Sequence, residues 1–433
     1  MPSVMTAAGV YHTDHLSTHA ARLQHLLRTG DRVEVHKCVE RTHEAFCMNV
    51  REGWSVCRDG RLPLLLRNVI LDRSTYSDPT YSAAVLSFFA DIVEYASGLD
   101  RRVRDRVVDE LLAWGDKIWE TLLVMLQTIV HHCRLFPCLG TSLAELTLAY
   151  NNLYCERDKV PKLIGSDFGR LVMCAWACRI GSGPDDRALH IFETLRRRAP
   201  AAQCSSFCQR FVNARSPDEV VLRFRCEFNR TELSGANFGA ALRGMCFMGG
   251  AGGAPTLGPA LVRHDVFRSL YEALCRQTNV DNREEEWCAI RGASEFLWTL
   301  FTGCFDMNTP RTYRHVEYLM AFMARASIIG PNFENHDASK HLRLWLQLHV
   351  NLGLLALNIR KQNSRHAVPR EIRRLVHHHF TRGVVMNALD EYRSRSHETR
   401  AYRNGKAMMN AWFELGMAAG LPGKEEILAR RRR

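Results

Sequence analysis

The fold is decided by the stretch Val85-Leu86-Ser87-Phe88-Phe89-Ala90-Asp91-Ile92-Val93. Its large apolar residues recur at steps of three and four, which places Val85, Phe88, Phe89, Ile92 and Val93 on one face of a helix. The alternation of apolar and polar residues that is typical of strands is hard to find. The stretch therefore predicts a helix that buries one face against the rest of the protein.

The same spacing continues on both sides of this stretch. Apolar residues at 107, 111, 114, 118 and 122, and then at 125, 129 and 133, predict one long helix or two helices joined near Gly115. Further amphipathic helices are predicted at residues 143–153, 168–180, 188–197, 207–212, 220–228, 266–274, 287–305, 313–326, 341–359, 372–380 and 407–418.

Short turns separate these helices. Turn-forming residues stand at Asp78-Pro79, Gly181-Ser182-Gly183-Pro184, Ser216-Pro217 and Gly330-Pro331. Connections of this length favour antiparallel neighbours, and no repeat of fixed period is visible. The sequence thus predicts an all-α fold, either an irregular helical repeat of the armadillo or HEAT-like α-solenoid kind or a multi-helix bundle.

The length of 433 residues favours more than one domain or an elongated array. The conspicuous break is the glycine-rich run from Met248 to Pro255, which contains too much glycine for a stable helix. We therefore predict an N-terminal helical region at residues 1–248, a connector at 249–256, a C-terminal helical region at 257–420 and a basic tail at 421–433. The run lacks the spacing of a P-loop or a dinucleotide-binding turn, so we interpret it as a connector.

Composition points to the interior of the cell. No apolar run approaches the eighteen or so residues that would span a bilayer, and the first fifteen residues lack the pattern of a secretory signal. We expect a cytoplasmic or nuclear protein without a membrane partner. The 15 cysteines are odd in number and irregular in spacing, which indicates free thiols. Cys47, between Phe46 and Met48, is expected to pack as a small hydrophobic residue.

The ligand-type residues do not predict a metal site or a cofactor. Cys174 with Cys178 and Cys204 with Cys208 are each four residues apart, but core packing explains such pairs inside apolar helices. Neighbouring histidines point to different helix faces, which disfavours one ion at His131, His132, Cys133 and Cys138, or at His377, His378 and His379. The motifs HExxH and GxSxG and the kinase set are absent from the sequence. A catalytic Cys/His pair assembled by folding stays open.

Positive charge is concentrated at the C-terminal end. Residues 360–433 hold 17 Lys and Arg against 7 Asp and Glu, which is about +10 of the formal net charge of +12. Arg370, Arg373 and Arg374 surround apolar positions, so we interpret them as the solvated face of a helix. The four arginines Arg430, Arg431, Arg432 and Arg433 cover no apolar residue, and we predict an interaction or targeting role for them.

These observations favour a non-enzymatic helical scaffold that mediates protein–protein interaction, with its basic C-terminal region contacting an acidic partner. One alternative is a protein associated with nucleic acid through the same charges, although no recognised reading module accompanies them. The other alternative is a cysteine-dependent enzyme.

Several apolar and aromatic runs indicate a resemblance to a protein family. The similarity covers residues 80–330 and rests on four runs: Trp114-Gly115-Asp116-Lys117-Ile118-Trp119, Asp158-Lys159-Val160-Pro161 after Leu153-Tyr154, Ile191-Phe192-Glu193-Thr194-Leu195 and His264-Asp265-Val266-Phe267. In them the chain resembles helical proteins of basidiomycete (mushroom-type) fungi that are related to MYND-finger proteins. The finger is absent, because no paired CxxC knuckles occur. The resemblance implies a helical scaffold only, without zinc-dependent peptide binding and without any functional residue.

Overall fold

A computed structural model describes most of the first three hundred residues. The described ranges are 14–29, 32–48, 61–99, 101–158, 167–177, 186–250, 257–277 and 283–301, with short pieces at 54, 55, 58, 318, 321, 322, 325, 326, 410–414, 416 and 417. In the longer ranges the chain forms fifteen α-helices and one 3-10 helix, and no described residue lies in a strand. The predicted all-α class is confirmed. In the same ranges no helix is long and apolar enough to cross a bilayer.

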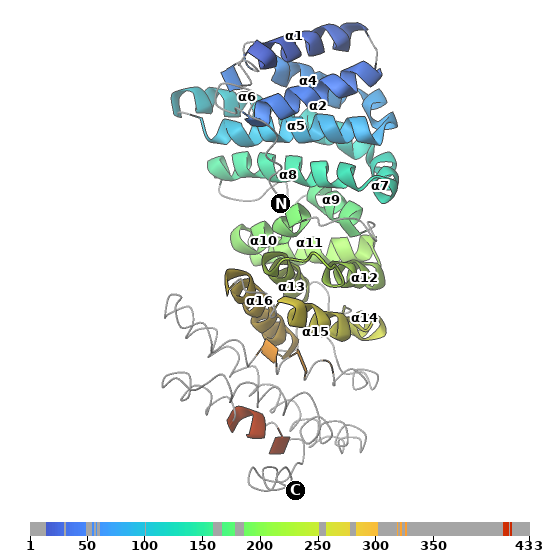
Figure 1. The fold of residues 1–433 in the computed structure, drawn as a ribbon, viewed down its shortest axis with the longest axis vertical. Coiled ribbons are helices and arrows are strands. Elements are labelled where there is room, and N and C mark those ends of the chain that lie inside the picture. The colour runs from blue at the N-terminus through green and yellow to red at the C-terminus, as the bar shows by residue number, and fades with distance from the viewer. Residues whose placement is uncertain are drawn as a thin grey trace, which may run out of the picture. The chain divides into compact units, whose positions relative to one another are not determined.

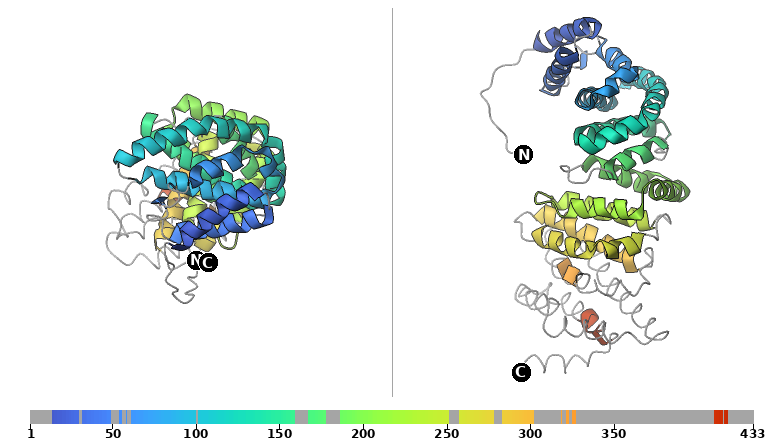
Figure 2. Two further views of the ribbon diagram at one scale, coloured as in Figure 1. Left: turned by 90° about the horizontal axis from the view of Figure 1, so that it is seen from above. Right: turned by 90° about the vertical axis from the view of Figure 1, so that its right-hand side faces the viewer.

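The chain divides into two compact units, Met1–Ala199 and Pro200–Arg433. In the first unit α1 packs on α2, α2 and α4 pack on α5, α5 lies along α8, and α8 contacts α9 and α10. Figure 1 shows this succession of levels, and Figure 2 shows it from two further directions. The elements are α1 Asp14–Thr29, α2 Arg32–Met48, α4 Leu62–Leu71, η1 Arg73–Ser77, α5 Pro79–Ser97, α6 Arg101–Val124, α7 Leu126–Leu135, α8 Pro137–Asp158, α9 Asp167–Ala177 and α10 Asp186–Arg198.

Helix α5 is the centre of the first unit and contains the stretch that predicted the fold. The five apolar residues of its predicted face are fully buried, between α2, α4, α6 and α8. The helix begins where the sequence indicates, because the Asp78 carboxylate accepts hydrogen bonds from the backbone N–H groups of Thr80 and Tyr81 and Pro79 occupies the first helical position. The predicted helix is therefore confirmed in both its position and its buried face.

The joint between α6 and α7 differs from the prediction. Helix α6 continues through Gly115 and ends at Val124, and the chain turns at Met125 before α7. Gly115 serves packing instead of a bend. A Cβ at this position would lie 2.8 Å from the hydroxyl of Tyr154 and 3.4 Å from the Tyr150 ring, so the absent side chain makes room for the tyrosines of α8.

The second unit is held together by a close approach of two helices. Its elements are α11 Ala201–Ala214, α12 Pro217–Phe228, α13 Gly235–Gly250, α14 Leu257–Arg263, α15 Val266–Gln277 and α16 Arg283–Phe301. Helices α13 and α16 lie side by side with glycines where they meet. A Cβ on Gly292 of α16 would lie 2.7 Å from the Cα of Gly239 on α13, and a Cβ on Gly239 would lie 2.6 Å from the Cys288 carbonyl oxygen.

The division into units differs from the sequence interpretation. The boundary lies at Ala199 and Pro200, where an extended Pro200 separates α10 from α11. The sequence placed a connector at residues 249–256, but Gly249 and Gly250 complete the last turn of α13, which is buried against α16 over most of its length. Tertiary packing offsets the poor helix propensity of glycine there. Residues 251–256 and the basic tail at 421–433 lie outside the described residues.

Candidate functional site

The arginines chosen from the sequence lie outside the described residues. This holds for Arg430, Arg431, Arg432 and Arg433, and also for Arg370, Arg373 and Arg374. Their interaction or targeting role therefore stays a prediction from the sequence.

The paired cysteines are core residues where the structure describes them. Cys174 is buried on α9 and Cys178 lies outside the described residues, while Cys204 and Cys208 are both buried on α11. Burial raises the pKa of the Cys208 thiol, which is the behaviour of a packing residue. The described cysteines are all free thiols, as predicted.

Folding brings together three other residues that the sequence analysis did not single out. Among the described residues, His43 and Cys47 of α2 and Asp91 of α5 form the one group of three ligand-type side chains whose donor atoms all lie within 4.8 Å of one another. The His43 Nε2 atom lies 2.6 Å from Asp91 Oδ2, and the Cys47 Sγ atom donates to the same oxygen at 3.5 Å. One carboxylate oxygen thus faces both an imidazole nitrogen and a thiol.

Local packing holds this cluster in place at the edge of the core. The His43 ring stacks on Phe88 of α5 with centroids 5.0 Å apart, and Phe88 is fully buried against Phe46 of α2. The side chains of His43 and Asp91 are 21% and 29% exposed, so water and small solutes reach the cluster. The two helices therefore fix its positions while leaving it accessible.

Electrostatics within the cluster keep Asp91 ionised and Cys47 protonated. Burial favours the neutral form of Asp91, but the hydrogen bond and charge of His43, the Cys47 thiol and the charge of Arg187 outweigh it and lower the pKa of this carboxyl group. Cys47 is exposed as a residue, but partial burial of its thiol, and then the negative charge of Asp91, raise its pKa to about 11. A nucleophilic cysteine needs the opposite shift, so the cluster does not resemble an activated Cys/His pair.

The expectation that Cys47 packs as a small hydrophobic residue was wrong. Cys47 is exposed, although its neighbour Phe46 is buried. Successive residues on a helix point about 100° apart, so an apolar neighbour in sequence does not place a side chain in the core. Two sequence signals could have found the cluster. His43 and Cys47 are four apart on one helix face, and Asp91 is the one charged residue between positions 79 and 93.

A second polar feature lies on the other side of α2. A cavity of about 170 Å³ opens between α1 and α2 and is lined by His19, Arg22, Glu34, Lys37, Cys38 and Arg41. Three of these side chains are permanently cationic and one is anionic. The Arg22 guanidinium lies 3.7 Å from the Glu34 carboxylate, and both side chains are more than half exposed. We call this feature the α1–α2 pocket.

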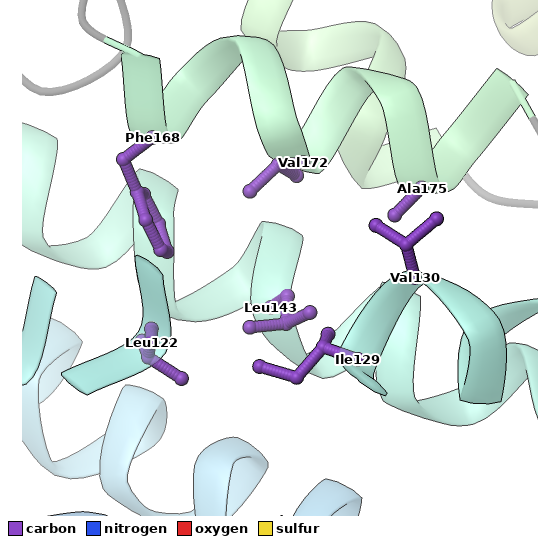
Figure 3. A pocket seen from close by; sticks show the side chains of 7 residues that line it. All are labelled: Leu122, Ile129, Val130, Leu143, Phe168, Val172 and Ala175. Atoms are coloured by element: carbon purple, nitrogen blue, oxygen red, sulfur yellow. The ribbon is translucent and has the colours of Figure 1, made fainter. Parts of the chain in front are cut away.

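A small cavity between α6, α7, α8 and α9 has no polar group that could bind a ligand. It has a volume of about 10 Å³ and is lined by apolar side chains alone, which Figure 3 shows pointing toward one another from these helices. A water molecule needs two to four polar partners, and this lining provides none. The lining residues are Leu122, Ile129, Val130, Leu143, Phe168, Val172 and Ala175.

Comparison of the whole chain with protein-family models, curated protein sequences and solved structures finds no match.

Proposed function

We propose that this protein is a non-enzymatic helical scaffold that binds an acidic protein partner through cationic surfaces. The stacked helices of the first unit use their apolar faces against one another and present charged faces to water. Such stacks, including armadillo and HEAT-like arrays, offer long surfaces for partners. The scaffold would act in the cytoplasm or the nucleus.

The α1–α2 pocket is the observation that carries this proposal. Arg22, Lys37 and Arg41 surround it, and Glu34 is its one carboxylate, so the lining bears a net charge of +2 with His19 neutral. The Arg22–Glu34 pair is exposed and 3.7 Å apart, and exposed pairs of this kind contribute about 0 to 1 kcal/mol. A carboxylate from a partner therefore competes with Glu34 on nearly equal terms and adds contacts to Lys37 and Arg41.

The basic C-terminal tract supports the same role from the sequence. Its net charge of about +10 over residues 360–433 would attract an acidic partner over a distance of about one Debye length, near 8 Å at physiological salt. We propose that this tract steers the partner and that Arg430, Arg431, Arg432 and Arg433 contact it. Steering affects the association rate more than the affinity.

The pocket is tested by binding of a fluorescent polyglutamate peptide to the full chain. Reversing two charges with Lys37→Glu and Arg41→Glu should weaken binding by about 5- to 30-fold, since each reversal removes an attraction of up to about 1 kcal/mol. The matched control is Arg28→Glu, which reverses an exposed arginine of α1 outside the pocket lining and is compared with Arg41→Glu alone, so that each variant changes the net charge by the same amount. Equal loss in both variants would mean that overall charge, and not the pocket, governs binding.

The tract is tested in the same assay by deleting residues 424–433 and neutralising Arg370, Arg373 and Arg374. The association rate should fall, and the fall should shrink as salt is raised. An unchanged rate would overturn the role of the tract. Micromolar binding of mixed-sequence DNA or RNA at physiological salt, lost steeply at higher salt, would instead support the nucleic-acid alternative.

A further inference from the structure

We propose that His43, Cys47 and Asp91 bind a divalent metal ion, Zn²⁺, on the accessible edge between α2 and α5. This site goes beyond the proposed scaffold function and does not depend on it. The three residues supply an imidazole nitrogen, a thiolate sulfur and a carboxylate oxygen, which are the ligand types that Zn²⁺ takes in proteins.

Two of the three distances between donor atoms are close to those of a zinc site, and His43 Nε2 and Cys47 Sγ lie within 4.8 Å of each other. Zinc bonds of about 2.0 to 2.3 Å in tetrahedral geometry place ligand atoms about 3.3 to 3.6 Å apart. The separation of Cys47 Sγ and Asp91 Oδ2 is already 3.5 Å. His43 Nε2 and Asp91 Oδ2 lie 2.6 Å apart because a hydrogen bond joins them, so an ion entering between them would widen that distance by less than about 1 Å.

The framework suits an ion because two packed helices hold the ligands. His43 and Cys47 are one turn apart on α2, and Asp91 stands opposite on α5, where α2 and α5 contact each other directly. The stack of the His43 ring on Phe88 limits rotation of the imidazole. Ligands on rigid helices lose little conformational entropy when they bind, which favours a defined site over a chance contact.

Charge balance also favours the ion. A thiolate and a carboxylate neutralise the two positive charges of Zn²⁺. On binding, the Cys47 thiol proton and the proton on His43 Nε2 leave to solvent, and the neutral imidazole, protonated at Nδ1, donates the Nε2 lone pair to the metal. Arg187, the cation whose charge acts on Asp91, is paired with Glu145 at 3.1 Å, which offsets its repulsion of an ion.

Three protein ligands leave one tetrahedral position open. In structural zinc sites the protein fills all four positions, whereas an open position accepts water or a ligand from another molecule. We infer that this fourth position takes solvent or an electron-pair donor from a bound partner. The partial exposure of His43 and Asp91 gives such a donor a path to the ion.

The test uses the full chain, reduced with a non-chelating phosphine and freed of metal. Titration with Zn²⁺ against a chromophoric chelator should show one tight site per chain, and Co²⁺ in its place should give a thiolate-to-metal absorption band. Cys47→Ser should remove the band and weaken Zn²⁺ binding by at least about 100-fold, because even partners beyond the direct ligands are worth about 10- to 100-fold.

The matched control is Cys138→Ser, which removes another exposed thiol of the same unit and should leave both readouts unchanged. Asp91→Asn provides a second variant, which should weaken binding while keeping an amide at the same place. Circular dichroism checks that each variant keeps its helices. The proposal is overturned if the chain binds no Zn²⁺ at micromolar concentration, or if Cys47→Ser keeps the band and the affinity of the native chain.

Discussion

The glycine contact between α13 and α16 leads to a prediction whose sign is opposite to the usual one. Replacing glycine by alanine inside a helix normally stabilises it by about 1 kcal/mol. At Gly292 the added Cβ would lie 2.7 Å from the Cα of Gly239 and 3.0 Å from its carbonyl oxygen. Carbon atoms pack best at about 3.5 to 4.0 Å, so the two helices would have to separate by about 0.8 to 1.3 Å. Because the contact is backbone on backbone, no flexible side chain can absorb the change.

The expected magnitude follows from these two opposing effects. Overpacking of this kind costs about 1 to 3 kcal/mol, and a contact with backbone falls in the upper part of that range. After the propensity gain, Gly292→Ala should destabilise the second unit by about 1 to 2 kcal/mol, which lowers its urea midpoint by about 0.5 to 1 M for a slope near 2 kcal/mol per M. The midpoint is measured by helical circular dichroism on the full chain.

The control lies in the helix opposite. Gly250, the last residue of α13, would carry a Cβ with no atom within 4 Å, so Gly250→Ala should leave the midpoint unchanged or raise it slightly. If Gly292→Ala is as stable as the native chain, or more stable, the close approach of α13 and α16 is not a determinant of this unit, and the argument from the two glycines fails.

Three further predictions concern stability and pH. Glu227→Gln should cost about 3 to 5 kcal/mol in thermal or urea unfolding, because it leaves the fully buried Arg223 without its carboxylate at 2.5 Å. Glu272→Gln, which removes one partner of a solvent-exposed pair with Arg268, should cost much less, and equal costs in the two variants would contradict this. Asp78→Ala should cost about 1 kcal/mol at pH 7 through loss of the α5 cap. Burial raises the pKa of the Asp78 carboxyl group, but hydrogen bonds from the residues that it caps outweigh burial and lower this pKa. The stabilisation by Asp78 is therefore present above the unfolded pKa of about 3.9 and is lost as pH falls through the folded value. A difference in stability between Asp78→Ala and the native chain that persists unchanged below about pH 3 would refute this. Leu143→Ala should cost about 2 to 5 kcal/mol in thermal unfolding, because it enlarges an apolar cavity that already exists beside a buried side chain, and a loss below 1 kcal/mol would mean that the cavity collapses.

The candidate metal site depends on a contact between two helices that the sequence alone does not reveal. The spacing of His43 and Cys47 places both on one face of a helix, and this much is visible in the chain. The third donor, Asp91, comes from another helix 44 residues later than Cys47. In sequence Asp91 is one of two acidic residues in a largely apolar helix, and many residues could have faced it. Only the packing of α2 on α5 places Asp91 beside His43 and Cys47.

The helical class and most helix positions were determined by the sequence alone. A spacing of three and four residues depends only on the geometry of one helix, so the buried face of α5 and its start at Asp78 could be derived without any neighbour. Proline and serine likewise marked the start of α12 at Ser216 and Pro217. These are local properties, because the interactions that produce them lie within a few residues.

The tertiary structure alone decided the properties that depend on what each helix meets. Gly115 permits close packing instead of a bend, and Gly249 and Gly250 stay helical, because contacts from distant residues outweigh glycine's weak propensity for helix. The same dependence on distant contacts left Cys47 exposed and placed it beside Asp91. A sequence records which faces are apolar but not which faces meet, and the candidate sites of this protein arise where they meet.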